Sequence, residues 1–598
     1  MKKTRYSVKT VCLLAMCGVA LFANAQDDKK KEQDLNRQMT LEREYDPSVQ
    51  DASKVNTLPQ VKEPEVRKIP IDYSDYTLAM DPAQQISVLP SGNIMTQMDY
   101  NKRRGYLRLG AGTYMNLNGD FGYHALSTAT DQLSIAFSHR SANGNVKYIQ
   151  LPDEKVKAKI NDNLGGLKYA HAFEKASLNV GLNYGYSAYN YYGLSMLSFS
   201  SLPMQDLLNK ADRETNQVNQ TIAATLGVES KEDADLAYLV DLGFVNFSRK
   251  YGISKDTDGP KETTIEAKVN VSKRFNGDMR FGLEALVEYF NYSLPAEKAL
   301  PNGGLYICEF ENHAEVALHP YYEVEGENWK VRLGANVMLK TGDESLFMAT
   351  PNVAANFEVA DKTELYIKAN GKLYSNSMYE MSKINRYLPA EELTPSRNWL
   401  DGVLGIKSGV APGFWFDIFA GYKMTSDDVL FVPGRTFEEG GFGNFSEAMS
   451  GINTKQLFVG ASLKYSYQQL FELTLKGQYN NWKAEYGDEW IGFSDSSLEH
   501  AWGKPEMELN AGVMVRPMDK LAVAFDYSLA TGRYTLLAGV DLYKMNNINE
   551  LNLTATYTLN DTFGFYAKVN NLLSQKYELY YGYPMQRLSA QVGVNINF

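Results

Sequence analysis

Cysteine is scarce in this sequence, which has three: Cys12, Cys17 and Cys308. The first two fall in an N-terminal leader, so the rest of the chain holds one thiol and cannot form an internal disulfide. Apolar runs of about 18 or more residues are also missing after the leader, which excludes transmembrane helices. The chain therefore depends on neither disulfides nor membrane-spanning helices.

An excess of basic residues is absent as well. The formal net charge is −11, with 60 Lys and Arg against 71 Asp and Glu. Removing the four basic residues of the leader takes the charge from −11 to −15. This balance argues against a nucleic-acid partner and against broad attraction to anionic surfaces.

The leader spans residues 1–25. It opens with Lys2, Lys3, Arg5 and Lys9, continues with an apolar run and ends in Ala23-Asn24-Ala25. This order is typical of a cleaved secretory signal peptide. We expect an exported protein whose mature chain begins near Gln26, and a Gln rather than a Cys at that position argues against a lipoprotein.

Aromatic residues are abundant, with 40 Tyr and 27 Phe among 598 residues. An exported chain that is rich in aromatics and only moderately hydrophobic fits an outer-membrane β-barrel. In such barrels every second residue faces lipid, and aromatic girdles lie at the membrane boundaries.

The end of the chain alternates strictly between apolar and polar residues. The apolar positions are Phe598, Ile596, Val594, Val592, Ala590 and Leu588. Asparagine, glycine, glutamine and serine lie between them, as expected for a strand with one lipid-facing side. We predict a closing barrel strand, with Phe598, Ile596, Val594 and Val592 as its membrane-insertion signal.

Residues 26–104 differ from the rest of the chain. A charged run is followed by six prolines with little periodicity, a density that blocks regular strands and helices. The segment is predicted to have no regular fold and to lie in the periplasm or docked in the lumen. Docking is favoured by apolar positions between Tyr73 and Leu89, which are unusual in a solvated linker.

From residue 105 to residue 598, long alternating segments are separated by short polar turns and longer irregular connections. The predicted turns are 127–131, 173–175, 230–233, 276–278, 325–328, 361–362, 411–413, 468–469, 516–519 and 560–561. Ten short turns separate eleven hairpins, so we predict an all-β antiparallel barrel of about 22 strands. Long connections are expected at 141–157, 193–214, 251–261, 376–396, 427–451 and 488–500.

The residues Val569 to Tyr577, followed by Tyr581-Gly582-Tyr583-Pro584 and the last strand, resemble the closing strands of TonB-dependent receptor barrels. That family has a V-x-N-L-x-x-K-x-Y segment, a glycine- and aromatic-rich loop and a barrel of 22 strands. The resemblance covers the barrel region, and its specific part is the last 40 or so residues. The family also has a globular N-terminal plug, for which residues 26–104 are too short and too rich in proline.

A barrel of this width needs something to fill it, because barrel diameter grows with strand number. Three possibilities stay open: the segment 27–104, inward-facing loops such as 427–451, or another protein. Without a plug, the energised uptake implied by the resemblance lacks its moving part.

Few residues suggest a site. Tyr189, Tyr191 and Tyr192, with Phe442 and Phe445 of a glycine-rich stretch, are candidate ligand or partner loops, although an aromatic girdle also explains the tyrosines. His313 and His319 are about 20 Å apart on a strand, which disfavours a shared metal. We expect no catalytic residue, cofactor or metal, and no enzyme activity; a rim enzyme is a remote alternative.

Two functions stay open for this chain, which we expect in the outer membrane of a diderm bacterium. One is a receptor or transport pore for an unknown solute. The other is a plugless structural subunit of an outer-membrane complex for barrel assembly or surface lipoproteins. Expected partners are outer-membrane lipids, the barrel assembly machinery during insertion and, depending on the function, a surface lipoprotein, TonB or other complex subunits.

Overall fold

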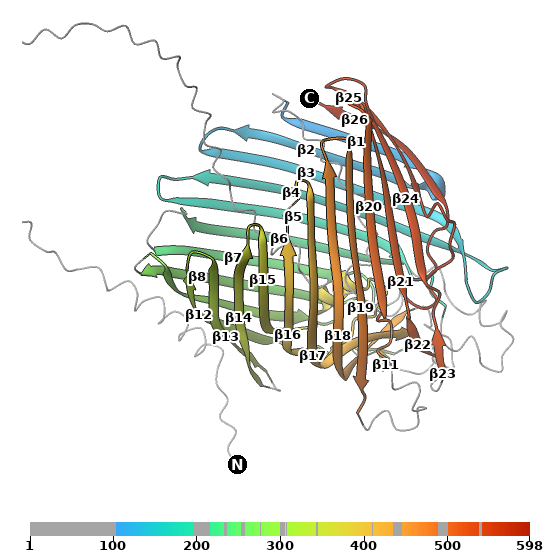
Figure 1. Cartoon of the computed structure of the whole chain (residues 1–598). Coiled ribbons are helices and arrows are strands. Elements are labelled where there is room, and N and C mark those ends of the chain that lie inside the picture. The colour runs from blue at the N-terminus through green and yellow to red at the C-terminus, as the bar shows by residue number, and fades with distance from the viewer. Residues whose placement is uncertain are drawn as a thin grey trace, which may run out of the picture. The chain divides into compact units, whose positions relative to one another are not determined.

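The chain forms one closed antiparallel β-barrel in a computed structural model (Figure 1). The structure describes residues 103–194, 216–231, 236–252, 257–275, 277–299, 305–306, 308–342, 345–409, 411–434, 445–487, 500–537 and 541–598. The predicted signal peptide and the segment 26–102 lie outside these residues, as does Phe442. Among the described residues, no helix has the length and apolar character to cross a membrane.

The barrel contains 22 strands in one sheet, each paired with its neighbours in the chain, as the turn count predicted. The strands are β1 (Gly105–Gly112), β2 (Leu117–Ser127), β3 (Asp131–Lys147), β4 (Lys155–Ala172), β5 (Ala176–Asn190), β6 (Asn216–Ser230), β7 (Leu236–Arg249), β8 (Lys261–Phe275), β9 (Met279–Ser293), β12 (His313–Glu325), β13 (Trp329–Thr341), β14 (Leu346–Ala360), β15 (Thr363–Tyr374), β16 (Ser396–Ser408), β17 (Phe414–Pro433), β18 (Ser446–Tyr467), β19 (Phe471–Glu485), β20 (Met507–Met518), β21 (Leu521–Thr531), β24 (Ile548–Thr558), β25 (Phe563–Asn570) and β26 (Ser589–Asn597).

The connections between the barrel strands contain short hairpins, a 3-10 turn and a helix. Two short hairpins are formed by β10 (Lys298–Ala299) with β11 (Leu305–Tyr306) and by β22 (Tyr534–Leu537) with β23 (Asp541–Lys544). A 3-10 turn, η2, spans Thr113–Met115, and the helix α4 spans Met378–Ile384.

The barrel closes where the first strand meets the last. Arg108 is paired with Asn595 and Leu109 with Val594 across β1 and β26. The backbone N–H of Gly105 donates to the carbonyl of Phe598 at 2.8 Å. The last strand is therefore the closing strand, as its alternation predicted.

The strand ends that the ten short turns join all lie at one end of the barrel, which also holds Gly105 and Phe598; we call it the turn end. The strand ends that the longer connections join lie at the opposite end, the loop end. Two predicted loops are shorter than expected, because Ser141–Lys147 extends β3 and most of 427–451 extends β17 and β18. Strands of 20 and 22 residues exceed the roughly 9–11 that a membrane requires, so these hairpins project beyond it.

The two faces of the wall differ in chemistry, as the alternation predicted. Large apolar side chains point outward and are exposed, among them Phe347, Leu404 and Val592, which is 66% exposed. Polar neighbours such as Gln591 and Asn480 point inward and are buried. An apolar outside and a polar inside are what a barrel surrounded by lipid requires.

Candidate functional site: a lid of packed loops

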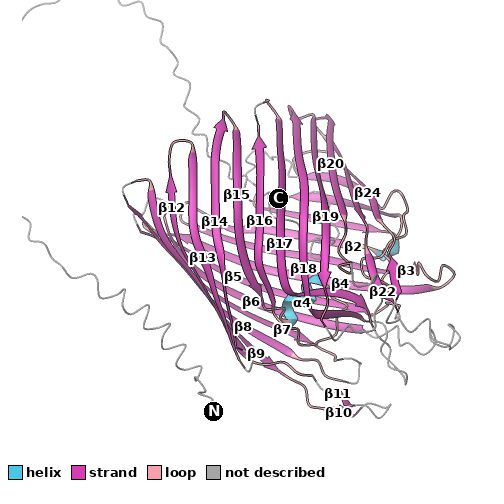
Figure 2. Ribbon diagram, turned by 60° about the horizontal axis from the view of Figure 1, so that its bottom comes forward, coloured by secondary structure: helices cyan, strands magenta, loops and turns pink. Residues whose placement is uncertain are grey.

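The connection between β15 and β16, residues 375–395, folds into the barrel rather than away from it. We call it the inner loop, and Figure 2 shows its helix α4 inside the ring of strands. This connection occupies the lumen, and of the stretch 427–451 that the sequence suggested, residues 435–444 lie outside the described residues. The last loop, residues 571–588, meets it from the other side, and the two loops together form what we call the lid.

The neck of the inner loop is fixed by Asn376. This residue adopts φ +52°, a left-handed conformation that asparagine tolerates better than most residues. Its side-chain amide donates to the carbonyl of Thr394 at 2.7 Å and to the hydroxyl of Ser396 at 2.8 Å. The two ends of the loop are therefore tied together where it leaves the wall.

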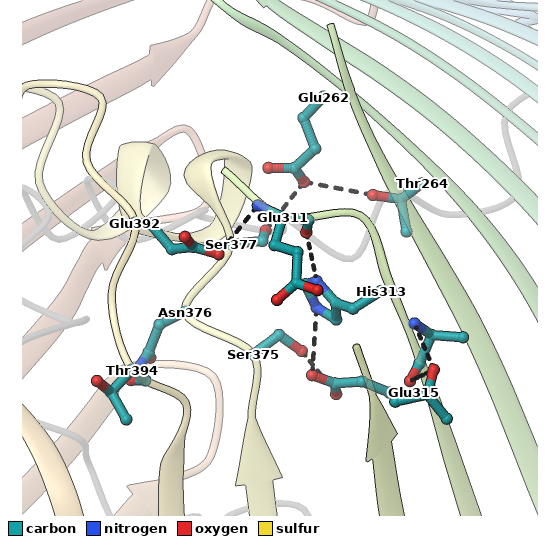
Figure 3. A network of polar contacts seen from close by, with 12 residues as sticks. Glu262, Thr264, Glu311, His313, Glu315, Ser375, Asn376, Ser377, Glu392 and Thr394 are labelled. Carbon is teal, nitrogen blue, oxygen red and sulfur yellow. Dashed lines mark hydrogen bonds and ion pairs between the residues drawn. The ribbon is translucent and has the colours of Figure 1, made fainter. Parts of the chain in front are cut away.

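The helix α4 is capped at its N-terminus by Ser377, whose hydroxyl accepts from the backbone N–H of Glu380 at 3.3 Å. Glu262 of β8 contacts the same end and accepts from the Ser377 hydroxyl at 2.9 Å (Figure 3). It also accepts from the Tyr379 backbone N–H at 3.0 Å. A carboxylate is favourable there because the first N–H groups of a helix lack partners within it. The wall strand β8 thereby fixes the start of the helix.

Arg386, just after α4, joins the inner loop to β4. Its guanidinium donates to both carboxylate oxygens of Asp162, at 3.1 and 3.0 Å. The hydroxyl of Ser187 on β5 donates to the same carboxylate at 2.6 Å. Paired hydrogen bonds of this kind are geometrically specific, so they fix the position of the loop as well as holding it.

The inner loop also contacts β5, β7 and β18 through its backbone carbonyls. The hydroxyl of Tyr189 donates to Arg386 O at 2.5 Å, and the guanidinium of Arg249 donates to Leu388 O at 2.9 Å. On the far side, the backbone N–H of Ser446 donates to Tyr387 O at 3.1 Å. The loop therefore bridges strands from both sides of the barrel.

Aromatic rings join the inner loop to the last loop. The rings of Tyr387 and Tyr583 are stacked with centroids 3.9 Å apart, and Tyr192 packs edge-on against both. The hydroxyl of Tyr580 donates to Ile384 O at 2.7 Å. Gly582 has φ +79°, and a Cβ there would lie 2.4 Å from Leu194 O, so this close approach requires glycine.

A buried carboxylate supports the last loop. Glu578 accepts from the backbone N–H of Gly582 at 2.8 Å and from the Gln150 amide at 3.0 Å. Its own backbone carbonyl accepts from the guanidinium of Arg533 at 2.8 Å. Burial raises the pKa of the Glu578 carboxyl to about 7, although these donors and the nearby guanidinium favour its charged form.

The predicted tyrosines pack against this lid. Tyr189, Tyr191 and Tyr192 are 1–4% exposed, and Tyr191 packs edge-on against Phe445 at 4.5 Å. The girdle interpretation is wrong for these tyrosines, because a girdle residue faces lipid and these are buried inside. Their role as ligand contacts stays a prediction, and Phe442 is outside the described residues.

Sequence reasoning missed Asp162, Arg386 and Tyr387. One signal was available, since Ser377 and Glu380 have the spacing of a helix-capping box within a connection expected to be irregular. The partners of Arg386 and Tyr387 lie on strands and loops far along the chain, which no local pattern indicates.

The histidines that lie near one another in the sequence have separate partners. His313 Nδ1 lies 3.0 Å from Glu311 O, and His319 Nδ1 lies 2.7 Å from Asn336 Oδ1. Within the described ranges, no group of three or more His, Cys, Asp or Glu residues is arranged to hold a metal ion.

Comparison with solved structures identifies the fold. The ferric-catecholate import receptor Fiu from E. coli K12 is 10% identical, with a TM-score of 0.60, covering 83% of this chain and 82% of that one. The FrpB iron transporter from Neisseria meningitidis (F3-3 variant) is 10% identical, with a TM-score of 0.62 and the same coverages of 83% and 82%. The siderophore receptor PiuA from Acinetobacter baumannii is 9% identical, with a TM-score of 0.59, and also covers 83% and 82%.

These structures share the 22-strand barrel of the TonB-dependent receptors, so the resemblance seen in the closing strands is confirmed at the level of the fold. No protein-family model matches the sequence, and no curated protein matches it. The likeness therefore identifies the fold and does not identify a solute.

Proposed function

We propose that this protein is an outer-membrane receptor or transport pore in which the lid closes the barrel toward the cell exterior. The observation that carries the proposal is the inner loop, which reaches from Asp162 and Arg249 on one side to Ser446 on the other. A barrel of 22 strands is wide enough to need such a closure. The loop end faces outward in this proposal, because outer-membrane barrels place their short turns in the periplasm.

The polar inner wall supports a water-filled path for a hydrophilic solute once the lid moves. Paired charges line it, such as Arg332 with Glu284 at 2.7 Å and Lys407 with Glu364 at 3.2 Å. The names of the similar structures make ferric catecholates and other siderophores the first solutes to test. TonB and a surface lipoprotein are the partners that we propose for opening the lid, and the segment 26–104 is the part that would reach the periplasmic partner.

The test is conductance in planar lipid bilayers. Wild-type protein is expected to conduct poorly, and replacement of residues 377–393 by a short Gly-Ser linker to give large stepwise conductance. The matched control is Arg332→Ala, which breaks an ion pair of the wall outside the lid and should leave conductance low. Because residues 26–102 could also block the lumen, both lid forms are measured with and without them.

The alternative function predicts different results. A structural subunit would copurify in stoichiometric amounts with lipoproteins or assembly subunits from native membranes. Such copurification, or a barrel that stays closed when the lid and residues 26–102 are both removed, would overturn the transport proposal. Conductance that appears on removal of the lid, together with recovery of the protein alone or with TonB, supports it.

A further inference from the structure

The outer wall is hollowed where the barrel closes. A groove with a volume of about 1010 Å³ lies over β21, β24, β25, β26, β1, β2 and β3, and we call it the seam groove. Leu109, Leu117, Phe137, Phe565 and Val592 line it, and all five are exposed on the outward face of the wall. The groove therefore opens toward the lipid and not toward the lumen.

Two glycines meet in the wall beneath the hollow. Gly110 of β1 and Gly593 of β26 are directly paired, and the ring of Tyr566 lies against both. A Cβ on Gly110 would be 2.0 Å from the Tyr566 hydroxyl oxygen, and one on Gly593 would be 2.3 Å from both that ring and Leu109 O. Glycine in a strand allows such close approach, so the two glycines leave room for the Tyr566 ring on the inner face.

The strands that form the wall are also short at this point. β1 and β25 have 8 residues each and β26 has 9, against 15 in β5, β6, β8 and β9. Tilted strands of roughly 9–11 residues are needed to cross the hydrocarbon core. A shorter apolar wall forces the surrounding lipid to adapt, which costs free energy unless lipid is held in a suitable arrangement.

The chemistry of the groove restricts its occupant. β1 is paired on both sides, with β2 and β26, so no strand edge is free here to receive a peptide. Arg108 points inward toward Asn595 at 2.8 Å, and Asp120, its partner across β1 and β2, lies on the same face. His139, at the margin, has both ring nitrogens within hydrogen-bond distance of Asn163 and Ser141, which leaves neither for a head group. An aliphatic chain fits this lining.

We propose that the seam groove is a binding site for the acyl chains of a membrane phospholipid, which fill the hollow beside the closing strands. A flat protein partner would leave the concave floor empty, whereas flexible acyl chains follow it. The proposal depends on the barrel being in a lipid bilayer and not on transport.

The experiment is native mass spectrometry of the detergent-purified full chain after addition of 1-palmitoyl-2-oleoyl phosphatidylethanolamine. Ala567→Phe places a ring in the groove, since Ala567 is exposed on its floor. The matched control is Ala349→Phe, at an exposed outward position of β14. Wild type and the control should retain phospholipid, and Ala567→Phe should bind it about tenfold more weakly, as expected from losing the burial of about two methylene groups.

A second variant protects the test if Ala567→Phe fails to fold. Val592→Trp enlarges a side chain that already projects into the groove and is 66% exposed, so the strand itself is not strained. Loss of phospholipid in either groove variant, with retention in Ala349→Phe, supports the proposal. Equal retention in all variants, or no retention in the wild type, overturns it.

Discussion

The ring of Tyr387 in the inner loop is stacked on the ring of Tyr583 in the last loop, with centroids 3.9 Å apart and planes inclined by 21°. Tyr583 is 1% exposed, and Tyr192 closes the cluster from a third connection. This stack is where the two halves of the lid meet. The lid should therefore respond to changes at either ring without any change in the strands.

Tyr583→Ala should loosen the lid and leave the barrel folded. Removing a large buried aromatic side chain costs about 3 kcal/mol or more. The loss is expected as faster protease cleavage within residues 375–395 and as more frequent openings in bilayers. Heat-modifiable migration on gels should stay as in the wild type. The lipid-facing Tyr184→Ala is the control, and an equal effect there would contradict the assignment.

Arg386 and Asp162 should behave as a coupled pair. Because both side chains are about one third exposed, we expect a coupling free energy of about 1 kcal/mol, at the upper end for exposed pairs. The measurement is a double-mutant cycle of Arg386→Ala and Asp162→Ala, read as hydrogen-exchange protection of α4. Additive effects of the two substitutions would mean that the ion pair does not hold the loop.

The last loop should become less stable as pH rises. Burial raises the pKa of the Glu578 carboxyl from 4.5 to about 7, so the folded loop binds more protons than the released loop between these values. Loop packing should be strongest below about pH 4.5 and weaken until pH passes about 7. Protease cleavage within 571–588 should rise over that range. Glu578→Gln should remove the dependence, whereas Glu327→Gln, in a turn at the other end, should keep it.

Phe598 should contribute to closure of the barrel. Its ring stacks near Phe121 and Tyr123 of β2, with centroids 6.4 and 6.1 Å away. Deleting Phe598 also removes the carbonyl that accepts from Arg104 N and Gly105 N, at 2.9 and 2.8 Å. We expect poor membrane insertion of the deletion variant and partial recovery with Phe598→Tyr, measured as heat-modifiable protein in the outer-membrane fraction. Normal assembly of the deletion variant would contradict this role.

The wall of this protein could be predicted from the sequence because its determinants are local. Alternation with a period of two assigns each residue of the last strand to lipid or lumen, and Val592 and Gln591 lie on the faces expected. Short polar turns such as 361–362 set the strand count, since each turn needs only its own few residues.

The lid and the seam groove were decided by tertiary structure. Nothing near Arg386 in the sequence specifies Asp162 as its partner, and the inward path of 375–395 depends on contacts with strands that are distant in the chain. The groove lies where Gly110 meets Gly593, a pairing that forms only when the barrel closes. Alternation with a period of two and turn chemistry act over a few residues, so they determine the strands and their number. The lid inside the barrel and the seam groove on its outer surface depend on which distant residues meet once the barrel has closed.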